Sequence, residues 1–237
     1  MNRRDGPVGR SENIIPVDSA ITSTWHVIVP VKHSSRGKSR LRPPEGVHRR
    51  DLALAIALDT VLAIVPAQQV FVVTADPEIR LQLRGSGAVL VDDPGRGLNA
   101  AVTAGISAVT SGAPHTPAAV LLGDLPALNT EELAGGLAAC AAAEAAVVPD
   151  HEGSGTVLLT HHDAARLVPR FGTGSAARHA RSATTLDLDL PRLRTDVDDD
   201  TSLALARKLG VGPWTGRLLD SSSGRPADGS PTDSPVG

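Results

Sequence analysis

Acidic residues at two separated places in the chain have the type and spacing that hold a divalent cation. Asp196 and Asp198 flank Val197, and on a strand at 195–197 residues two apart share a face. Two carboxylates held that close repel unless a cation or a shared proton lies between them. Asp124 follows a buried run at 118–122, so its carboxylate points into a crevice where it can bind a divalent cation.

Other interpretations of these aspartates stay open. The pair can be the polar side of an edge strand, and Asp187 with Asp189 shows the same spacing. We prefer Asp196 and Asp198 because a helix at 203–209 follows at once, with two further aspartates as its cap and first turn. Asp124 can itself cap the next helix, although Thr130 and the glutamate behind it offer a better cap.

A basic loop follows the first apolar run. Four cations, Gly37 and three serines lie between Pro30 and Leu41. Backbone N–H groups, lysine point charges and bidentate arginines suit a polyphosphate. The alternative is a solvated basic loop, and the G-x-x-x-x-G-K-[ST] pattern is absent. The cations of this loop are Lys32, Arg36, Lys38 and Arg40.

Three clusters of small residues offer further contacts with a ligand. Gly95 and Gly97 permit close approach of the backbone, and Asn99 behind them can cap the helix that starts there. The segments 153–156 and 171–179 can each wrap a small anion with N–H and hydroxyl donors, and the second opens a helix. Plain turn chemistry explains each cluster equally well.

The elements that must position these residues alternate along the chain. Buried, almost continuously apolar strands that alternate with helices predict an α/β fold with a mostly parallel sheet covered on both faces. Ligands then sit beyond the carboxyl ends of the strands. Segments 156–160, 183–188 and 195–197 predict strands of an edge element that closes over the site. The predicted strands are 25–31, 70–74, 88–91, 118–122 and 145–148, and the predicted helices are 48–65, 77–84, 99–110 and 130–143.

Composition excludes several classes of protein. Among 237 residues, 23 basic and 26 acidic side chains give a formal net charge of −3, which lacks the electrostatic footprint of a nucleic-acid-binding protein. Cys140 is the only cysteine, so intramolecular disulfides and zinc sites built on several thiolates are excluded. No run approaches the about 18 apolar residues that a membrane span needs, and no secretory signal is visible. We therefore expect a cytoplasmic protein without a membrane partner.

The chain divides into one domain and two tails. Residues 1–22 are polar and aperiodic, and residues 219–237 are mostly Ser, Asp, Gly and Pro, a composition that cannot bury enough surface to become ordered. The prediction is a flexible N-terminal tail at 1–22, a single domain at 23–218 and a disordered C-terminal tail at 219–237.

Taken in order, six short motifs resemble the phosphoenolpyruvate / 2-phospho-L-lactate guanylyltransferase family of coenzyme F420 biosynthesis. They are PVK with GKSRL, GLN, GDLPAL, VPD with GT, FGTGS with a following His, and DVDD. The resemblance covers residues 25–215. It implies a single-domain nucleotidyltransferase fold, a Rossmann-like three-layer α/β sandwich related to MobA and GT-A proteins.

The resemblance also implies a reaction and its partners. GMP passes from GTP to phosphoenolpyruvate, pyrophosphate leaves, and a partner enzyme of the F420 pathway accepts the unstable product. The aspartates Asp124, Asp196 and Asp198 would hold Mg²⁺, with Asp124, Lys38 and Arg40 in catalysis. The acceptor would bind Thr156, Gly172 and Ser175, and the nucleotide would face Lys32, Lys38, Arg40, Gly97 and Asn99.

Two departures from the family pattern concern these assignments. Gly37 stands where the family often has Ala, and Asp199 and Asp200 follow the metal pair where the family tends to have Thr and Pro. The added negative charge puts the choice of ligands among these aspartates in doubt. Alternative functions are 2-phospho-L-lactate as acceptor, another GT-A-type nucleotidyl- or glycosyltransferase, or a nucleotide-binding module without activity.

Overall fold

The computed structural model describes residues 25–31 and 41–222. Predictions for Lys32, Lys38 and Arg40, for the tail at 1–22 and for residues after 222 lie outside this part of the chain.

One mixed sheet forms the middle of the described structure. Its strand order is β3-β2-β1-β4-β6-β5-β7, and β6 runs antiparallel to both of its neighbours while the other pairs are parallel. The mostly parallel sheet predicted above is thus confirmed. The strands are β1 (His26–Pro30), β2 (Gln69–Val73), β3 (Val89–Val91), β4 (Ala118–Leu121), β5 (Ala145–Pro149), β6 (Thr156–His161) and β7 (Thr184–Thr185).

The predicted edge element is wrong in two respects. Strand β6 lies inside the sheet, between β4 and β5, and of the three segments predicted for this element only the two-residue β7 is an edge strand. The segment 195–197 is no strand at all. A fully buried six-residue run such as β6 has the same apolar pattern in either direction, so the sequence does not reveal its orientation.

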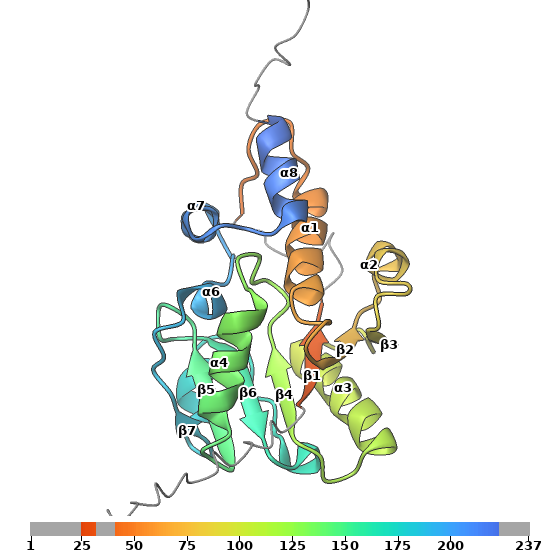
Figure 1. Ribbon diagram of the computed structural model, residues 1–237, viewed down its shortest axis with the longest axis vertical. Coiled ribbons are helices and arrows are strands. Elements are labelled where there is room, and N and C mark those ends of the chain that lie inside the picture. Colours follow the sequence, from red (N-terminus) through yellow and green to blue (C-terminus); the bar gives the residue numbers. More distant parts are fainter. Residues whose placement is uncertain (1–24, 32–40, 223–237) are drawn as a thin grey trace, which may run out of the picture.

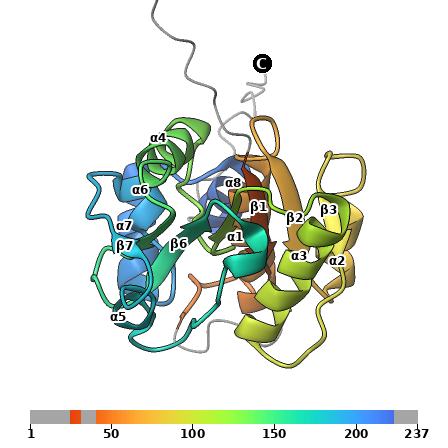
Figure 2. The same ribbon diagram turned by 90° about the horizontal axis from the view of Figure 1, so that it is seen from below.

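Helices cover both faces of the sheet, which makes the three layers expected of the fold. Figure 2 shows α3 and α4 on opposite sides of it. The helices are α1 (Arg49–Leu62), α2 (Pro77–Gln82), α3 (Leu98–Gly112), α4 (Thr130–Cys140), α5 (Ser175–His179), α6 (Pro191–Arg194), α7 (Asp200–Leu209) and α8 (Pro213–Ser222), with a 3₁₀ turn at Ala164–Arg166. Figure 1 labels every α-helix except α5, which Figure 2 labels. Asn129, and not Thr130, caps α4, because its side chain accepts the N–H of Glu132.

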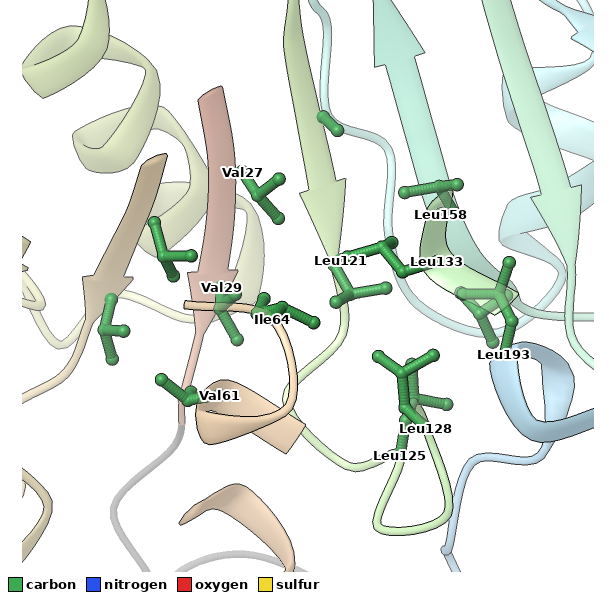
Figure 3. Packing of buried hydrophobic residues seen from close by; sticks show 14 of the residues in the cluster. Val27, Val29, Val61, Ile64, Leu121, Leu125, Leu128, Leu133, Leu158 and Leu193 are labelled. Atoms are coloured by element: carbon green, nitrogen blue, oxygen red, sulfur yellow. The ribbon is translucent and has the colours of Figure 1, made fainter. Parts of the chain in front are cut away.

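Alternate side chains of the central strands supply two apolar cores. Val27 and Val29 of β1 pack in one cluster with Leu121 of β4 (Figure 3), and side chains from α1 and α4 belong to the same cluster. Ile28 between them points to the other face and packs with Val102 of α3. Each fully buried aliphatic side chain contributes about 1.5–3 kcal/mol, so both cores hold the strand ends in place.

A third apolar cluster joins α1 to α7 and α8. The helix α8 was not predicted, and part of it lies in the segment taken for a tail. A residue far away in the sequence caps its first turn: the buried carboxylate of Asp59 in α1 accepts hydrogen bonds from the N–H groups of Trp214 and Thr215, at 2.9 and 2.7 Å. Burial raises the pKa of Asp59, and these two N–H bonds oppose that rise.

Candidate active site

A pocket of about 650 Å³ opens where β1 and β4 end. Pro30, the last residue of β1, and Val31 after it line the pocket, as do Gly123 and Asp124 in the segment after β4. Because β6 is antiparallel, its first residue, Thr156, lies at the same edge of the sheet. The position is the one predicted for a ligand in an α/β sheet, beyond the carboxyl ends of the strands.

Three carboxylates meet in this pocket. Oxygen atoms of Asp124, Asp196 and Asp198 all lie within 4.8 Å of one another. The N–H of Val197 donates to the carbonyl oxygen of Asp124 at 3.0 Å and joins the two segments, while the Val197 side chain is fully buried. The alternation that we predicted for a strand therefore occurs here in an irregular segment, which the Val197 hydrogen bond and the buried Val197 side chain hold in place.

Hydrogen bonds and burial hold the residues on both sides of the triad in place. The N–H of Leu125 donates to the Thr60 hydroxyl at 3.0 Å, and Leu125 is fully buried. On the other side, Asp199 caps α7 in a reciprocal capping box with Ser202. The capping role predicted for Asp199 is confirmed, and its carboxylate contributes to the helix cap.

The neighbouring carboxylates make the charged form of Asp196 unfavourable. Burial, then the neighbouring carboxylates of Asp124, Asp198 and Asp150, raises the pKa of Asp196 to about 8. The cost of this crowding falls when a cation neutralises the site, and three hard oxygen ligands suit a divalent ion. The triad thus has the donor set of a divalent metal site.

Asp150 shapes the next part of the pocket and was not predicted as a site residue. Its carboxylate accepts the N–H groups of Ser154 and Gly155 at 2.9 and 2.6 Å. The carbonyl of Ser154 accepts the N–H of Ala176 in α5. A side chain at Gly155 would run into the Asp150 carboxylate. The VPD and GT motifs therefore form one closed loop that leads directly into Thr156.

The three residues predicted to bind the acceptor line the same pocket. Thr156 and Ser175 are each only 2% exposed, and Gly172 adopts a φ of +118°, a conformation that other residues rarely take. The Thr156 hydroxyl lies 2.9 Å from Nδ1 of His179. The structure thus places these three residues together, beside the carboxylates.

Gly97 and Asn99, which were predicted to face the nucleotide, lie outside the lining of the pocket. Gly97 is the N-cap of α3, so Asn99 lies inside the helix and does not cap it. The Asn99 amide instead bonds to the backbone of Phe171. Neither residue lines the described pocket, although Leu98 between them does. Their contact with a nucleotide stays a prediction.

The competing aspartate pair lies elsewhere. Asp187 forms an ion pair with Arg194, and its side chain is 85% exposed. Neither Asp187 nor Asp189 lines the pocket. The choice of Asp196 and Asp198 over this pair agrees with the geometry.

Comparison with known proteins identifies the family of the chain. A family model described as a MobA-like NTP transferase domain matches residues 49–194. The phosphoenolpyruvate guanylyltransferase of Salinispora arenicola is 44% identical over 212 residues, covering 86% of this chain and 97% of its own. The chain belongs to the phosphoenolpyruvate guanylyltransferase family. Within that family, the enzyme of the same name from Streptomyces coelicolor is 45% identical over 199 residues, covering 81% of this chain and 93% of its own.

The guanylyltransferase family membership agrees with the fold. A solved nucleotidyl transferase from Methanothermobacter has a TM-score of 0.54 at 17% identity, covering 78% of this chain and 97% of its own. At that identity the likeness shows the fold alone, which is the nucleotidyltransferase sandwich predicted from the motifs. Among residues 25–31 and 41–222, no helix has the length and apolar character to cross a bilayer.

Proposed function

We propose that the protein transfers GMP from GTP to phosphoenolpyruvate, giving enolpyruvoyl-2-diphospho-5′-guanosine and pyrophosphate in coenzyme F420 biosynthesis. One observation carries the proposal: an acidic triad and the buried hydroxyl side chains of Thr156 and Ser175 line one pocket, in a chain whose relatives are named for this reaction. A pocket of about 650 Å³ falls within the usual size of a small-molecule site.

The resident metal of this proposal is Mg²⁺, held by Asp124, Asp196 and Asp198. When bound, Mg²⁺ would polarise phosphoryl oxygens and neutralise the charge that develops on the leaving pyrophosphate. The three carboxylates themselves come from two segments joined by the hydrogen bond from the Val197 N–H to the Asp124 carbonyl. The protein thus presents a preformed set of ligands, which lowers the cost of organising the site.

The acceptor needs to be held, and it needs no general base. Phosphoenolpyruvate is ionised at neutral pH, so one of its phosphate oxygens is already a nucleophile. That oxygen attacks the α-phosphorus of GTP, a P–O bond forms, and the bond from the α-phosphorus to the bridging oxygen breaks as pyrophosphate leaves. Catalysis is then mainly the positioning of two anions that repel each other.

The chain offers donors for both anions. Thr156, Gly172 and Ser175 would bind phosphoenolpyruvate through hydroxyl and N–H groups. Lys38 and Arg40 would stabilise the pyrophosphate, and Lys32 would face the GTP phosphates. The chain enters this basic loop directly from Val31, which lines the pocket.

A product assay tests the proposal. The protein is incubated with Mg²⁺ and either GTP or ATP, together with phosphoenolpyruvate or 2-phospho-L-lactate, and the products are identified by mass. The expected result is a guanylylated phosphoenolpyruvate with one pyrophosphate released for each product. Product only from 2-phospho-L-lactate would change the acceptor, product only from ATP would change the donor, and no product from any pair would refute the function.

A further inference from the structure

A buried histidine stands directly behind the predicted acceptor site. His179, at the end of α5, is 1% exposed, and its ring packs edge-on against Phe171 with centroids 4.9 Å apart. Both ring nitrogens have partners. Nδ1 lies 2.9 Å from the Thr156 hydroxyl oxygen, and Nε2 accepts the N–H of Arg170 at 2.8 Å.

These two contacts fix where the ring proton is. A backbone N–H can only donate, so Nε2 must be the acceptor and carries no proton. The neutral ring then has its proton on Nδ1, and this Nδ1–H donates to the Thr156 oxygen. The same direction follows for the threonine: its own hydroxyl proton points away from His179.

The Thr156 hydroxyl proton can form a hydrogen bond with a ligand in the pocket. Thr156 lines it, and no described residue accepts a hydrogen bond from the Thr156 hydroxyl. An anion placed in the pocket would therefore meet a hydroxyl already oriented as a donor.

We propose that His179 is a positioning residue, which holds the Thr156 hydroxyl as a hydrogen-bond donor toward the anionic acceptor substrate. The inference deepens the proposed function and rests on it, because it takes the acceptor to bind at Thr156. His179 itself lies behind Thr156 and does not line the pocket.

The charge state of the ring agrees with this role. Burial, then the positive charges of Arg178 and Arg170, lowers the pKa of His179 to about 4. The Arg178 side chain donates hydrogen bonds to the carbonyls of Arg170 and Thr173, and these bonds hold the loop at 170–173 beside the ring. The ring stays neutral near neutral pH, with one proton for its two nitrogens.

A pair of variants separates positioning from simple packing. In His179→Asn the amide nitrogen takes the place of Nδ1 and still donates to Thr156, whereas in His179→Gln the amide reaches only the place of Nε2. We expect H179Q to raise the KM for phosphoenolpyruvate about tenfold, the loss of one well-placed bond to a charged group. H179N should keep that KM within about twofold, and both variants should keep the KM for GTP.

A third variant shows whether the effect passes through the threonine. In a Thr156→Val background, H179Q should cause no further rise in the KM for phosphoenolpyruvate, because the hydroxyl it positions is gone. An unchanged KM in H179Q, equal rises in H179N and H179Q, or additive effects with T156V would each overturn the role of His179.

A measurement on the unaltered protein stands beside the kinetics. In ¹⁵N-labelled protein, the ring nitrogen shifts of His179 should show a protonated Nδ1 and an unprotonated Nε2, with a change at Nδ1 when phosphoenolpyruvate is added. A proton on Nε2, or no response at Nδ1 to a ligand that the enzyme turns over, would refute the inference. If the protein has no transferase activity, the proposed function fails by the product assay, whatever the tautomer.

Discussion

Asn99 and Phe171 lie 72 residues apart and are joined by a pair of hydrogen bonds. The Asn99 amide oxygen accepts the N–H of Phe171 at 2.8 Å, and its amide nitrogen donates to the carbonyl of Phe171 at 3.2 Å. The bonds fasten the start of α3 to the loop that contains Gly172. The amide oxygen accepts from one backbone group and the amide nitrogen donates to another. Asp lacks the donor and Leu lacks both groups, so neither residue can form this pair of bonds.

The first prediction follows from this pair. Asn99→Ala leaves the Phe171 N–H and carbonyl without their partner, so we expect a loss of about 1–3 kcal/mol in the free energy of unfolding. The loop at Gly172 loses its anchor, and the KM for phosphoenolpyruvate should rise several times more than the KM for GTP. Steady-state kinetics with each substrate varied in turn, together with urea unfolding, measure both effects.

Asn129→Ala is the matched control for Asn99→Ala. Asn129 caps α4 through the N–H of Glu132 and does not line the pocket, so its loss should lower stability by about 1 kcal/mol and leave both KM values unchanged. A rise confined to the KM for GTP in N99A would instead support the direct nucleotide contact predicted from the motif.

The second prediction concerns the acidic triad. Asp196→Asn removes a metal ligand and should lower kcat by about 100-fold or more. It also removes the cost of keeping this carboxyl group buried beside two others, so in EDTA its Tm should exceed that of the unaltered protein by roughly 2–4 °C, the shift for about 1 kcal/mol in a domain of this size. Addition of Mg²⁺ should raise the Tm of the unaltered protein and not that of D196N.

Asp187→Asn is the control for the triad. The exchange is chemically the same, but Asp187 is exposed and paired with Arg194 outside the pocket. Its kcat and its response to Mg²⁺ should equal those of the unaltered protein. Near-normal turnover in D196N would show that Asp196 is not a metal ligand.

The fold and the acidic triad could be predicted because local patterns encode them. Apolar runs mark the strands, and parallel strands bring their carboxyl ends to one edge, where Asp124 lies. The period-two spacing of Asp196 and Asp198 around an apolar Val197 keeps the two carboxylates together even though the segment is not a strand. The predictions of the fold and of the triad therefore depend only on residues close together in the sequence and on the direction in which a strand runs.

The contacts that hold the site together were not predictable in this way. His179 meets Thr156 across 23 residues, and Asp59 holds α8 across 155. Such pairs leave no periodic signal, because each depends on how two distant elements meet. The helix α8 was missed for the same reason: its residues resemble a polar tail until a buried carboxylate caps the first turn.

The third prediction tests the closed loop at Asp150. In Gly155→Ala the new methyl group meets the Asp150 carboxylate, which already accepts the Gly155 N–H, so we expect a loss of about 1–3 kcal/mol from the forced shift. Gly112→Ala has open space at the end of α3 and should be neutral or gain up to about 1 kcal/mol. Chemical unfolding of both proteins gives the comparison. Equal stability of G155A and G112A would contradict the close contact between position 155 and the Asp150 carboxylate.

The last prediction is the pH dependence that His179 gives to stability. Its pKa is about 4 in the folded protein against an ordinary value of 6.5. Between these values the unfolded chain binds the proton and the folded protein does not, so stability rises with pH across the window and is lost as the pH falls from 6.5 to 4. The loss reaches about 3 kcal/mol at its largest, from about 1.4 kcal/mol for each pKa unit. Other groups also titrate there, so the difference between the unaltered protein and His179→Asn isolates this contribution. The free energy of unfolding of both proteins is measured at pH 7 and at pH 4.5, and the two values should converge at the lower pH. Parallel pH profiles would mean that folding does not lower the pKa of His179.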